Sequence, residues 1–218
     1  METRRGEVNP PSATAAVGIV PEAVSSRTGV SVRYVQTAGM CWYVFRASYG
    51  REDKAFDYIV EQGTFAYIAK RYEDKPAGSV VKKALVNLIP NLLFVYTTAN
   101  KAQEFIKGTP ALSYLTYYYN HFEVNNEHKN PPLTIPCSEM ENFILATCNH
   151  SEHLRLVKSE HCHYKGGETV RVKSGQFKGV TGKVARVYGQ QRVVVSLSDA
   201  VGLISTAYIP TAFIEVID

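Results

Sequence analysis

The chain has 218 residues, of which 45% are hydrophobic and 20% are charged, so it can bury a core as one large or two small domains. The formal net charge is +4, and residues 164–218 carry seven basic against four acidic side chains. This composition excludes a chain that is disordered throughout. The basic C-terminal part is compatible with nucleic acid or an acidic protein face, although its excess charge is a weak signal.

Neither a targeting segment nor a membrane helix is expected. The start, METRRGEVNPPSATAAVG, is charged but has no apolar segment before Pro10 and Pro11. The longest apolar stretch, residues 84–96, is interrupted by polar residues and a proline, whereas a membrane helix needs about 20 apolar residues. The cysteines are too irregularly spaced for a disulfide framework: Cys41, Cys137, Cys148 and Cys162. We therefore expect a cytoplasmic protein with reduced thiols.

The first two-thirds of the chain predict an extension followed by an α+β domain. Residues 1–40 mix small residues and prolines without a period, which predicts a flexible extension. A strand at 41–48 and a helix ended by Gly63 follow, with Ala55, Phe56, Ile59 and Val60 on the apolar helix face. The next expected elements are a strand at 65–72, a polar turn at 73–79 and two strands within 82–97 that meet at Ile89-Pro90-Asn91. A short helix capped by Asn100 and running through Lys107 follows, then a strand at 112–119 and a polar loop at 120–132. The last expected helix is opened by a capping box at Ser138 and Glu141. Sheet and helices together predict an α+β domain over residues 41–148.

The last third predicts a linker and a small β domain. Residues 149–163 are polar, rich in histidine and without a period, which indicates a linker. From residue 164 to 218 five short strands punctuated by glycine predict a small closed barrel. We expect Gly175, Gly179 and Gly182 to supply positive φ angles and close backbone approach. The inward positions are expected to be Val170, Val172, Val180 and Val184.

Two stretches resemble known families. GETVRVKSGQFKGVTGKV (167–184) is similar to the KOW motif of ribosomal proteins and transcription elongation factors. WYVFRASYGRE with the following KA (42–55), and PNLLFV (90–95), resemble the NGN domain of NusG-type factors. Within that family, NPPLTIPCSEMENFI (130–144) and the ending AYIPTAFIEVID resemble the UpxY antiterminators of capsular polysaccharide operons, and the Pro-Asn-x-Leu-Phe-Val run also resembles RfaH.

The resemblance implies an antiparallel NGN sheet with helices, linked to an SH3-like barrel, and a function without catalysis or cofactor. It implies that the NGN domain binds the clamp helices of RNA polymerase in the bacterial cytoplasm and suppresses pausing and termination. That contact requires an exposed apolar patch on a rigid sheet. The expected contacts are Tyr43, Phe65, Ile89, Pro90 and Leu92, whereas Phe45 and Phe94 are more typical of the domain's own core. Leu92→Asp is expected to abolish polymerase association while the domain stays folded.

The sequence departs from RfaH at several positions. RfaH has aromatic residues where this chain has Ile89 and Leu92, and a tyrosine where this chain has Arg46. The His-Thr-Thr element with which RfaH makes its second polymerase contact has no clear counterpart within residues 101–107. Refolding of the C-terminal domain into helices, as in RfaH, is not expected here because VRVK and QRVVVSLS are dense in β-branched residues.

The resemblance also implies that the barrel binds a termination factor or the ribosome. Its basic side chains suit the phosphates of nascent RNA or non-template DNA, or else form a solvated face: Arg171, Lys173, Lys178, Lys183, Arg186 and Arg192. Two alternatives to an operon-specific antiterminator are a general NusG-like elongation factor and a ribosome-associated RNA-binding KOW protein. Residues 41–157 have no net charge, which disfavours the second alternative because an RNA-binding protein usually needs an excess of basic side chains.

A metal site or an active site is disfavoured by spacing. Zinc-type ligands occur at Cys148, His150, His153, His161, Cys162 and His163, but they lack paired C-x-x-C units. Glu52, Asp53 and Asp57 lie at a helix start, where carboxylates complement the helix dipole. No nucleophile or phosphate-binding loop accompanies them, so we predict neither an enzyme nor a bound metal.

Overall fold

The computed structural model describes residues 36–78 and 80–217, so only residues 36–40 of the predicted N-terminal extension are among the described residues. The strands are β1 (Met40–Ala47), β2 (Phe65–Tyr67), β3 (Lys70–Ala77), β4 (Val80–Asn87), β5 (Leu92–Thr98), β6 (Leu115–Tyr117), β7 (Thr134–Ile135), β8 (Arg155–Val157), β9 (His163–Val172), β10 (Thr181–Val187), β11 (Gln190–Leu197), β12 (Gly202–Tyr208) and β13 (Ile214–Val216). The α-helices are α1 (Glu52–Glu61), α2 (Ala99–Gln103), α3 (Cys137–Thr147) and α4 (Ser198–Val201), and α2 continues into the π-helical turn η2 (Glu104–Gly108). The 3-10 turns are η1 (Ser48–Gly50), η3 (Pro110–Leu112), η4 (Ser159–His161) and η5 (Thr211–Phe213).

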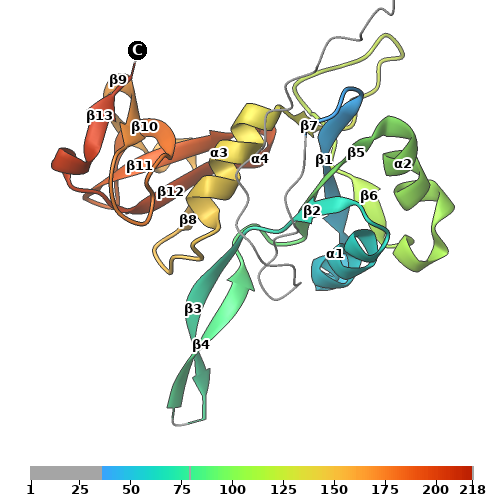
Figure 1. Cartoon of the computed structure of the whole chain (residues 1–218), viewed down its shortest axis with the longest axis horizontal. Coiled ribbons are helices and arrows are strands. Elements are labelled where there is room, and N and C mark those ends of the chain that lie inside the picture. Colours follow the sequence, from blue (N-terminus) through green and yellow to red (C-terminus); the bar gives the residue numbers. More distant parts are fainter. Residues whose placement is uncertain (1–35, 79, 218) are drawn as a thin grey trace, which may run out of the picture.

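The N-terminal part is built on an antiparallel sheet in the order β2-β5-β1-β6, with β7 also paired to β1. Because successive side chains of a strand point to opposite faces, β1 contributes to two separate cores. Trp42 and Val44 pack toward α3, whereas Tyr43 and Phe45 pack toward α1 and α2. Helices therefore cover both faces of this sheet, with α3 between it and the C-terminal strands (Figure 1).

The helix predicted to be ended by Gly63 is confirmed as α1, whose last residue is Glu61. Its apolar face is buried through Ala55, Phe56 and Ile59, and its first turn carries Glu52 and Asp53. Acidic residues suit this end because the helix dipole places partial positive charge there.

The predicted caps of the other two helices are wrong. Thr98 rather than Asn100 caps α2, since its Oγ1 accepts the Lys101 N–H at 3.3 Å. The helix α3 begins at Cys137 directly after an extended proline, and among the described residues no side chain caps it. The Ser138–Glu141 box is therefore not formed, because Pro136 stands at the N-cap position and the helix starts two residues too early for Ser138 to be its cap.

Strands β3 and β4 form a two-stranded hairpin that projects from the body of the molecule (Figure 1). They pair continuously from Lys70↔Asn87 to Ala77↔Val80. The polar turn predicted at 73–79 is wrong, because the turn is confined to the residues around Gly78, which has φ +65°. Both faces of the outer hairpin lie in solvent. Its strands therefore tolerate polar side chains and Pro76, which would be excluded from the strands of a buried sheet.

His150 fastens the base of this hairpin to the segment that follows α3. Its carbonyl accepts the Tyr72 N–H at 3.0 Å, and its Nδ1 lies 3.2 Å from the Lys70 carbonyl oxygen. A carbonyl only accepts, so Nδ1 carries the proton of the neutral ring. Burial lowers the pKa of His150 from its ordinary value of 6.5, against the hydrogen bond to Lys70, which raises it.

We expect the protein to lose stability as the pH falls from about 7 to about 5, because the unfolded chain then binds a proton that folded His150 resists. The stability from keeping this ring neutral is present above the unfolded-state pKa and is lost as the pH falls toward the lowered folded-state pKa. His150→Asn tests this, since asparagine tolerates the left-handed backbone at φ 52°. In thermal unfolding followed by circular dichroism, the wild-type Tm should fall more than the variant's over this range. Equal falls would contradict the assignment.

The C-terminal part forms an antiparallel sheet in the order β13-β9-β10-β11-β12-β8. The five strands predicted between residues 164 and 218 are confirmed as β9 to β13. Closure of this sheet into an SH3-like barrel stays a prediction.

The segment predicted as a linker contributes to this sheet. Residues 155–157 form β8, which pairs with β12 through Leu156↔Ile204. Leu154 is fully buried, and Val157 is 5% exposed. The polar composition of this segment predicted no strand, because β8 has too few apolar residues to show a hydrophobic period.

The glycines have the predicted roles. Gly175 and Gly179 have φ of +83° and +91°, the left-handed region that favours glycine. Gly182 has no positive φ, but a Cβ there would lie 2.8 Å from Val193 Cγ1 and would also meet the Val194 carbonyl oxygen. It permits the close approach of β10 to β11. The predicted inward valines are buried at 170, 172 and 180 and partly buried at 184.

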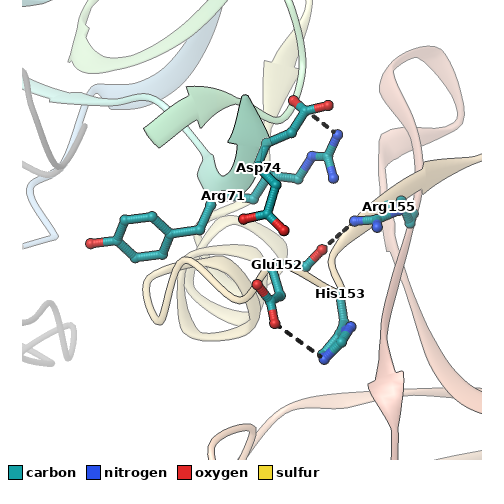
Figure 2. Close-up of a pocket in the computed structure, with 7 residues that line it drawn as sticks. Arg71, Asp74, Glu152, His153 and Arg155 are labelled. Carbon is teal, nitrogen blue, oxygen red and sulfur yellow. Dashed lines mark hydrogen bonds and ion pairs between the residues drawn. The ribbon is translucent and has the colours of Figure 1, made fainter. Parts of the chain in front are cut away.

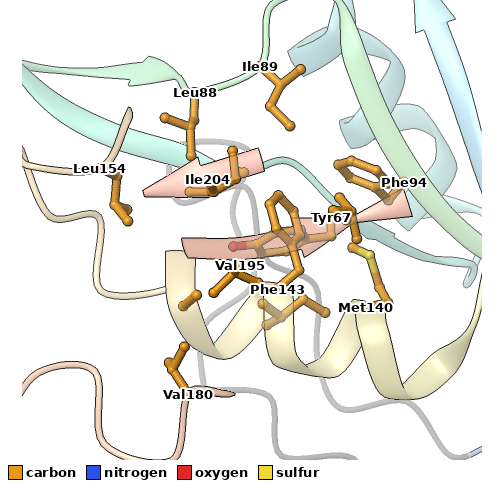
Figure 3. Packing of buried hydrophobic residues seen from close by; sticks show 14 of the residues in the cluster. Tyr67, Leu88, Ile89, Phe94, Met140, Phe143, Leu154, Val180, Val195 and Ile204 are labelled. Atoms are coloured by element: carbon orange, nitrogen blue, oxygen red, sulfur yellow. The ribbon is translucent and has the colours of Figure 1, made fainter. Parts of the chain in front are cut away.

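The largest core cluster spans both sheets. It contains Tyr67 and Phe94 from the N-terminal sheet and Phe143 from α3, together with Val195 and Ile204 from the C-terminal sheet (Figure 3). The Phe143 ring packs edge-on against Phe94 at 5.4 Å and against Tyr67 at 6.0 Å. A second cluster lies between the N-terminal sheet, α1 and α2, and a smaller third one lies beside β8.

Polar contacts hold α3 to the C-terminal sheet. The Asn142 side chain donates to the Thr181 carbonyl at 2.8 Å and accepts the Thr181 N–H at 2.9 Å. Leu145 lies against Gly179, where a Cβ would come within 3.1 Å of its Cδ2. None of the helices in the described residues has the length and apolar character needed to span a membrane.

Candidate partner-binding surfaces

The five predicted polymerase contacts do not form one exposed patch. Pro90 is exposed, and Tyr43 and Phe65 are partly buried. Ile89 and Leu92 are only 6% and 7% exposed and belong to the large core cluster. Phe45 and Phe94 are buried, as expected of core residues.

The expectation that Ile89 and Leu92 are exposed is therefore wrong in this arrangement. Both face the layer that contains α3, and the cluster continues from them into the C-terminal sheet. For the same reason Leu92→Asp is not a clean test of docking, because the carboxylate would enter the core and unfold the domain. The sequence indicated an apolar bend but not what packs on it, since that packing depends on contacts distant in the chain.

Tyr43 lines a groove on the opposite face of the N-terminal sheet. The groove has a volume of about 370 Å³ and is lined by Tyr43, Ala99, Gln103, Lys107, Tyr117, Pro132 and Thr134. The rings of Tyr43 and Tyr117 lie 6.2 Å apart, and Tyr119 follows 6.2 Å from Tyr117. Burial raises the pKa of both Tyr43 and Tyr117, so their hydroxyls stay protonated and able to donate at neutral pH. We call this surface the tyrosine groove.

Sequence reasoning missed Tyr117 and Tyr119. The run LSYLTYYY predicted a strand, but it gave no means of deciding which of its tyrosines share a face with Tyr43. That follows from the pairing Phe45↔Tyr117, which places alternate residues of β1 and β6 on one side of the sheet.

Five of the six predicted basic contacts of the C-terminal sheet are exposed, namely Arg171, Lys173, Lys178, Lys183 and Arg186. Arg171 and Lys183 stand at diagonal positions of β9 and β10, since Arg171 pairs with Thr181. Arg171 also lies 4.0 Å from Glu215, which partly neutralises it.

Arg192 is not a free cation of that face. Its Nη1 donates to the Thr206 carbonyl at 2.9 Å and to the His153 carbonyl at 3.2 Å, and its Nη2 donates to Gln190 Oε1 at 2.9 Å. These bonds tie β11 to β12 and to the segment before β8. The prediction that Arg192 contacts phosphate therefore conflicts with a structural role that already uses donors on both Nη1 and Nη2.

A polar pocket lies between the hairpin and the segment before β8. It has a volume of about 460 Å³, and Figure 2 shows Arg71, Asp74, Glu152, His153 and Arg155 around it. Lys83 donates to Glu152 at 2.6 Å and holds the pKa of that carboxyl below its ordinary value. Acidic and basic side chains alternate around this pocket, so it lacks the single sign of charge that a phosphate site needs.

The zinc-type ligands and the carboxylates at the start of α1 were the candidate metal and catalytic residues. In residues 36–78 and 80–217, no three His, Cys, Asp or Glu side chains are placed to hold a metal ion. Asp53 pairs with Lys70 at 2.6 Å, and Glu52 bonds the bend at residues 87–91. The carboxylates at the start of α1 thus have structural partners.

Comparison with protein families gives two matches in series. Residues 40–144 match the family described as transcription termination factor nusG, and residues 167–196 match the KOW motif. Among curated proteins no significant match is found. Both family domains belong to non-enzymatic transcription factors. The order of the two matches, together with the mixed, mostly antiparallel fold, supports a NusG-type transcription elongation or antitermination factor.

Proposed function

We propose that this chain is an antitermination factor that binds RNA polymerase through its N-terminal domain and suppresses pausing and termination. The observation that carries this proposal is the NusG match over residues 40–144 followed by the KOW match over residues 167–196. Binding to the clamp helices acts without bond chemistry: it keeps the clamp closed, and the polymerase continues elongation. The site of action is then the bacterial cytoplasm.

The proposed docking surface consists of two solvent-accessible parts. Pro90 projects from the bend between β4 and β5, and the tyrosine groove presents two half-buried aromatic rings beside Lys107. Aromatic side chains with a polar end are favoured in protein interfaces, because they bury a large area at low entropic cost. Ile89 and Leu92 join this contact only if the cluster that covers them opens.

A role in a capsular polysaccharide operon is the finer form of the proposal. It rests on the likeness of residues 130–144 and 207–218 to UpxY proteins. The alternative is a general NusG-like elongation factor that acts on most transcripts. Sequencing of nascent RNA with and without the protein separates them, since an operon-specific factor changes read-through at one locus and a general factor changes it at many.

We propose that the C-terminal sheet is an SH3-like barrel that binds a termination factor, the ribosome or nascent RNA. Its exposed lysines and arginines at 171, 173, 178, 183 and 186 support contact with an anionic partner. A ribosome-associated RNA-binding protein is the less favoured function, because Glu215 and the internal bonds of Arg192 reduce the free positive charge of this face.

We expect Pro90→Asp and Tyr43→Ala each to weaken binding to purified RNA polymerase by about tenfold, the effect of losing one anchor of an interface. Pro90 is exposed and Tyr43 borders a groove, so both variants should keep the wild-type circular dichroism spectrum. Phe122→Ala is the control, since Phe122 is 73% exposed on the loop after β6 and is not among the residues that line the groove. Binding is measured by biolayer interferometry. Wild-type affinity in both folded variants would contradict the docking surface.

A further inference from the structure

The bend at Ile89-Pro90-Asn91 is fixed to the turn before α1 by Asn91. The Asn91 carbonyl accepts the Ala47 N–H at 2.8 Å, and its Oδ1 accepts the Gly50 N–H at 3.2 Å. Its own N–H donates to Glu52 Oε1 at 3.2 Å. Asn91 holds φ +63°, a left-handed conformation that asparagine tolerates better than most residues. The backbone on one side of Pro90 is therefore bonded through every polar group of Asn91 except its side-chain amide nitrogen.

Glu52 is the buried centre of this arrangement. The residue is 4% exposed, and its Oε1 accepts from Asn87 Nδ2 at 2.7 Å as well as from Asn91. It thus joins the last residue of β4 to the residue after Pro90. Its Oε2 is buried and has no hydrogen-bond partner among the described residues. Burial of a carboxylate with one oxygen left without a hydrogen bond is costly. Glu52 lies in the first turn of α1, where the helix dipole offsets only part of that cost.

We propose that Glu52 is a positioning residue for polymerase binding, which acts by holding the Pro90 bend in one conformation before the partner arrives. This inference rests on the proposed function. If the bend had to become ordered on binding, the entropy cost would lower the affinity for the polymerase, whereas a bend that is already ordered avoids this cost. Asp57 stands on the same helix, is exposed and lies outside the set of bonds that hold the bend. Removal of Asp57 therefore controls for the loss of one negative charge from α1 without breaking a bond to the bend.

The test compares Glu52→Ala, Glu52→Gln and Asp57→Ala in the full chain. Two quantities are measured: amide hydrogen exchange at Gly50 and Asn91, and affinity for purified RNA polymerase at a temperature where all variants are folded. We expect Glu52→Ala to accelerate exchange at both amides and to weaken binding by about tenfold, the loss that accompanies a hydrogen bond to a charged group. Glu52→Gln retains an acceptor for Asn91 and should bind within about twofold of wild type, as should Asp57→Ala.

The outcomes separate this inference from the proposed function. If Glu52→Ala loosens the two amides but binds polymerase as wild type does, while Pro90→Asp does not, the positioning role is wrong and the docking surface stands. If both variants bind as wild type does, the docking surface itself is wrong. Should Glu52→Ala fail to fold, Asn87→Ala tests the same carboxylate without altering α1, because it removes one of the two hydrogen bonds that Glu52 Oε1 accepts. Wild-type affinity in Asn87→Ala with accelerated exchange at Asn91 would overturn the inference.

Discussion

Replacement of Phe143 with alanine is expected to lower the free energy of unfolding by about 3–5 kcal/mol, the range for truncation of a buried phenylalanine. Phe143 is fully buried in α3 and packs edge-on against Tyr67 and Phe94 of the N-terminal sheet. The same core cluster includes valines of the C-terminal sheet. The cavity would therefore open where the two sheets share a core, and both should become less stable.

Urea unfolding followed by tryptophan fluorescence measures this loss, because Trp42 is the chain's single tryptophan and belongs to the same cluster. The matched control is Phe122→Ala, which removes the same side chain from a loop where it is 73% exposed. The free energy of unfolding of the control should lie within about 0.5 kcal/mol of the wild-type value. A loss at Phe143 no larger than that at Phe122 would contradict the shared core.

Gly182→Ala is expected to destabilise the C-terminal sheet by about 3 kcal/mol, because overpacking a close approach forces the backbone to move. The new Cβ would meet the Val194 carbonyl oxygen and would lie 2.8 Å from Val193 Cγ1. The carbonyl is backbone in a paired strand, so β10 and β11 must separate to admit the methyl group. The thermal midpoint should fall by about 6–12 °C for a domain of this size.

Gly189→Ala separates steric overlap from backbone strain. Gly189 has φ +79°, and no other atom lies within 4 Å of the position that an alanine methyl group would occupy, so alanine there is strained but not crowded. We expect this control to lose about 1 kcal/mol. Differential scanning calorimetry of both variants decides the matter, and equal losses would show that crowding at Gly182 is not the cause.

Local patterns predicted most of the elements. The helical spacing of Ala55, Phe56 and Ile59 predicted α1, and the alternation of valine with charged residues predicted β9 to β11. In each case the residues of the buried face lie within one short stretch of the sequence, so their period is visible there. The hairpin was underestimated because its outer half buries nothing, and charged residues without a hydrophobic period predict a turn. The strand β8 was missed for the converse reason, since its three residues depend on pairing with β12, which lies far along the chain.

The candidate site was less predictable than the fold. The motif around Pro90 indicated an apolar bend, but the burial of Ile89 and Leu92 depends on tertiary packing that no local window contains. Glu52 was interpreted as a helix-dipole partner, which its position supports, while its bond to Asn91 joins residues 39 positions apart. Tyr117 became visible as a neighbour of Tyr43 only through strand pairing. Residues that act together from different strands are found by register rather than by spacing.

We propose that this chain shortens the pauses of RNA polymerase through a surface that includes Pro90. The direct measurement is the half-life of a defined pause in single-round transcription by purified bacterial RNA polymerase, with wild-type protein or Pro90→Asp added. We expect wild-type protein to shorten the pause, and Pro90→Asp, folded and at the same concentration, to leave it close to the value without protein. An unchanged pause with wild-type protein, or equal shortening by both, would contradict it.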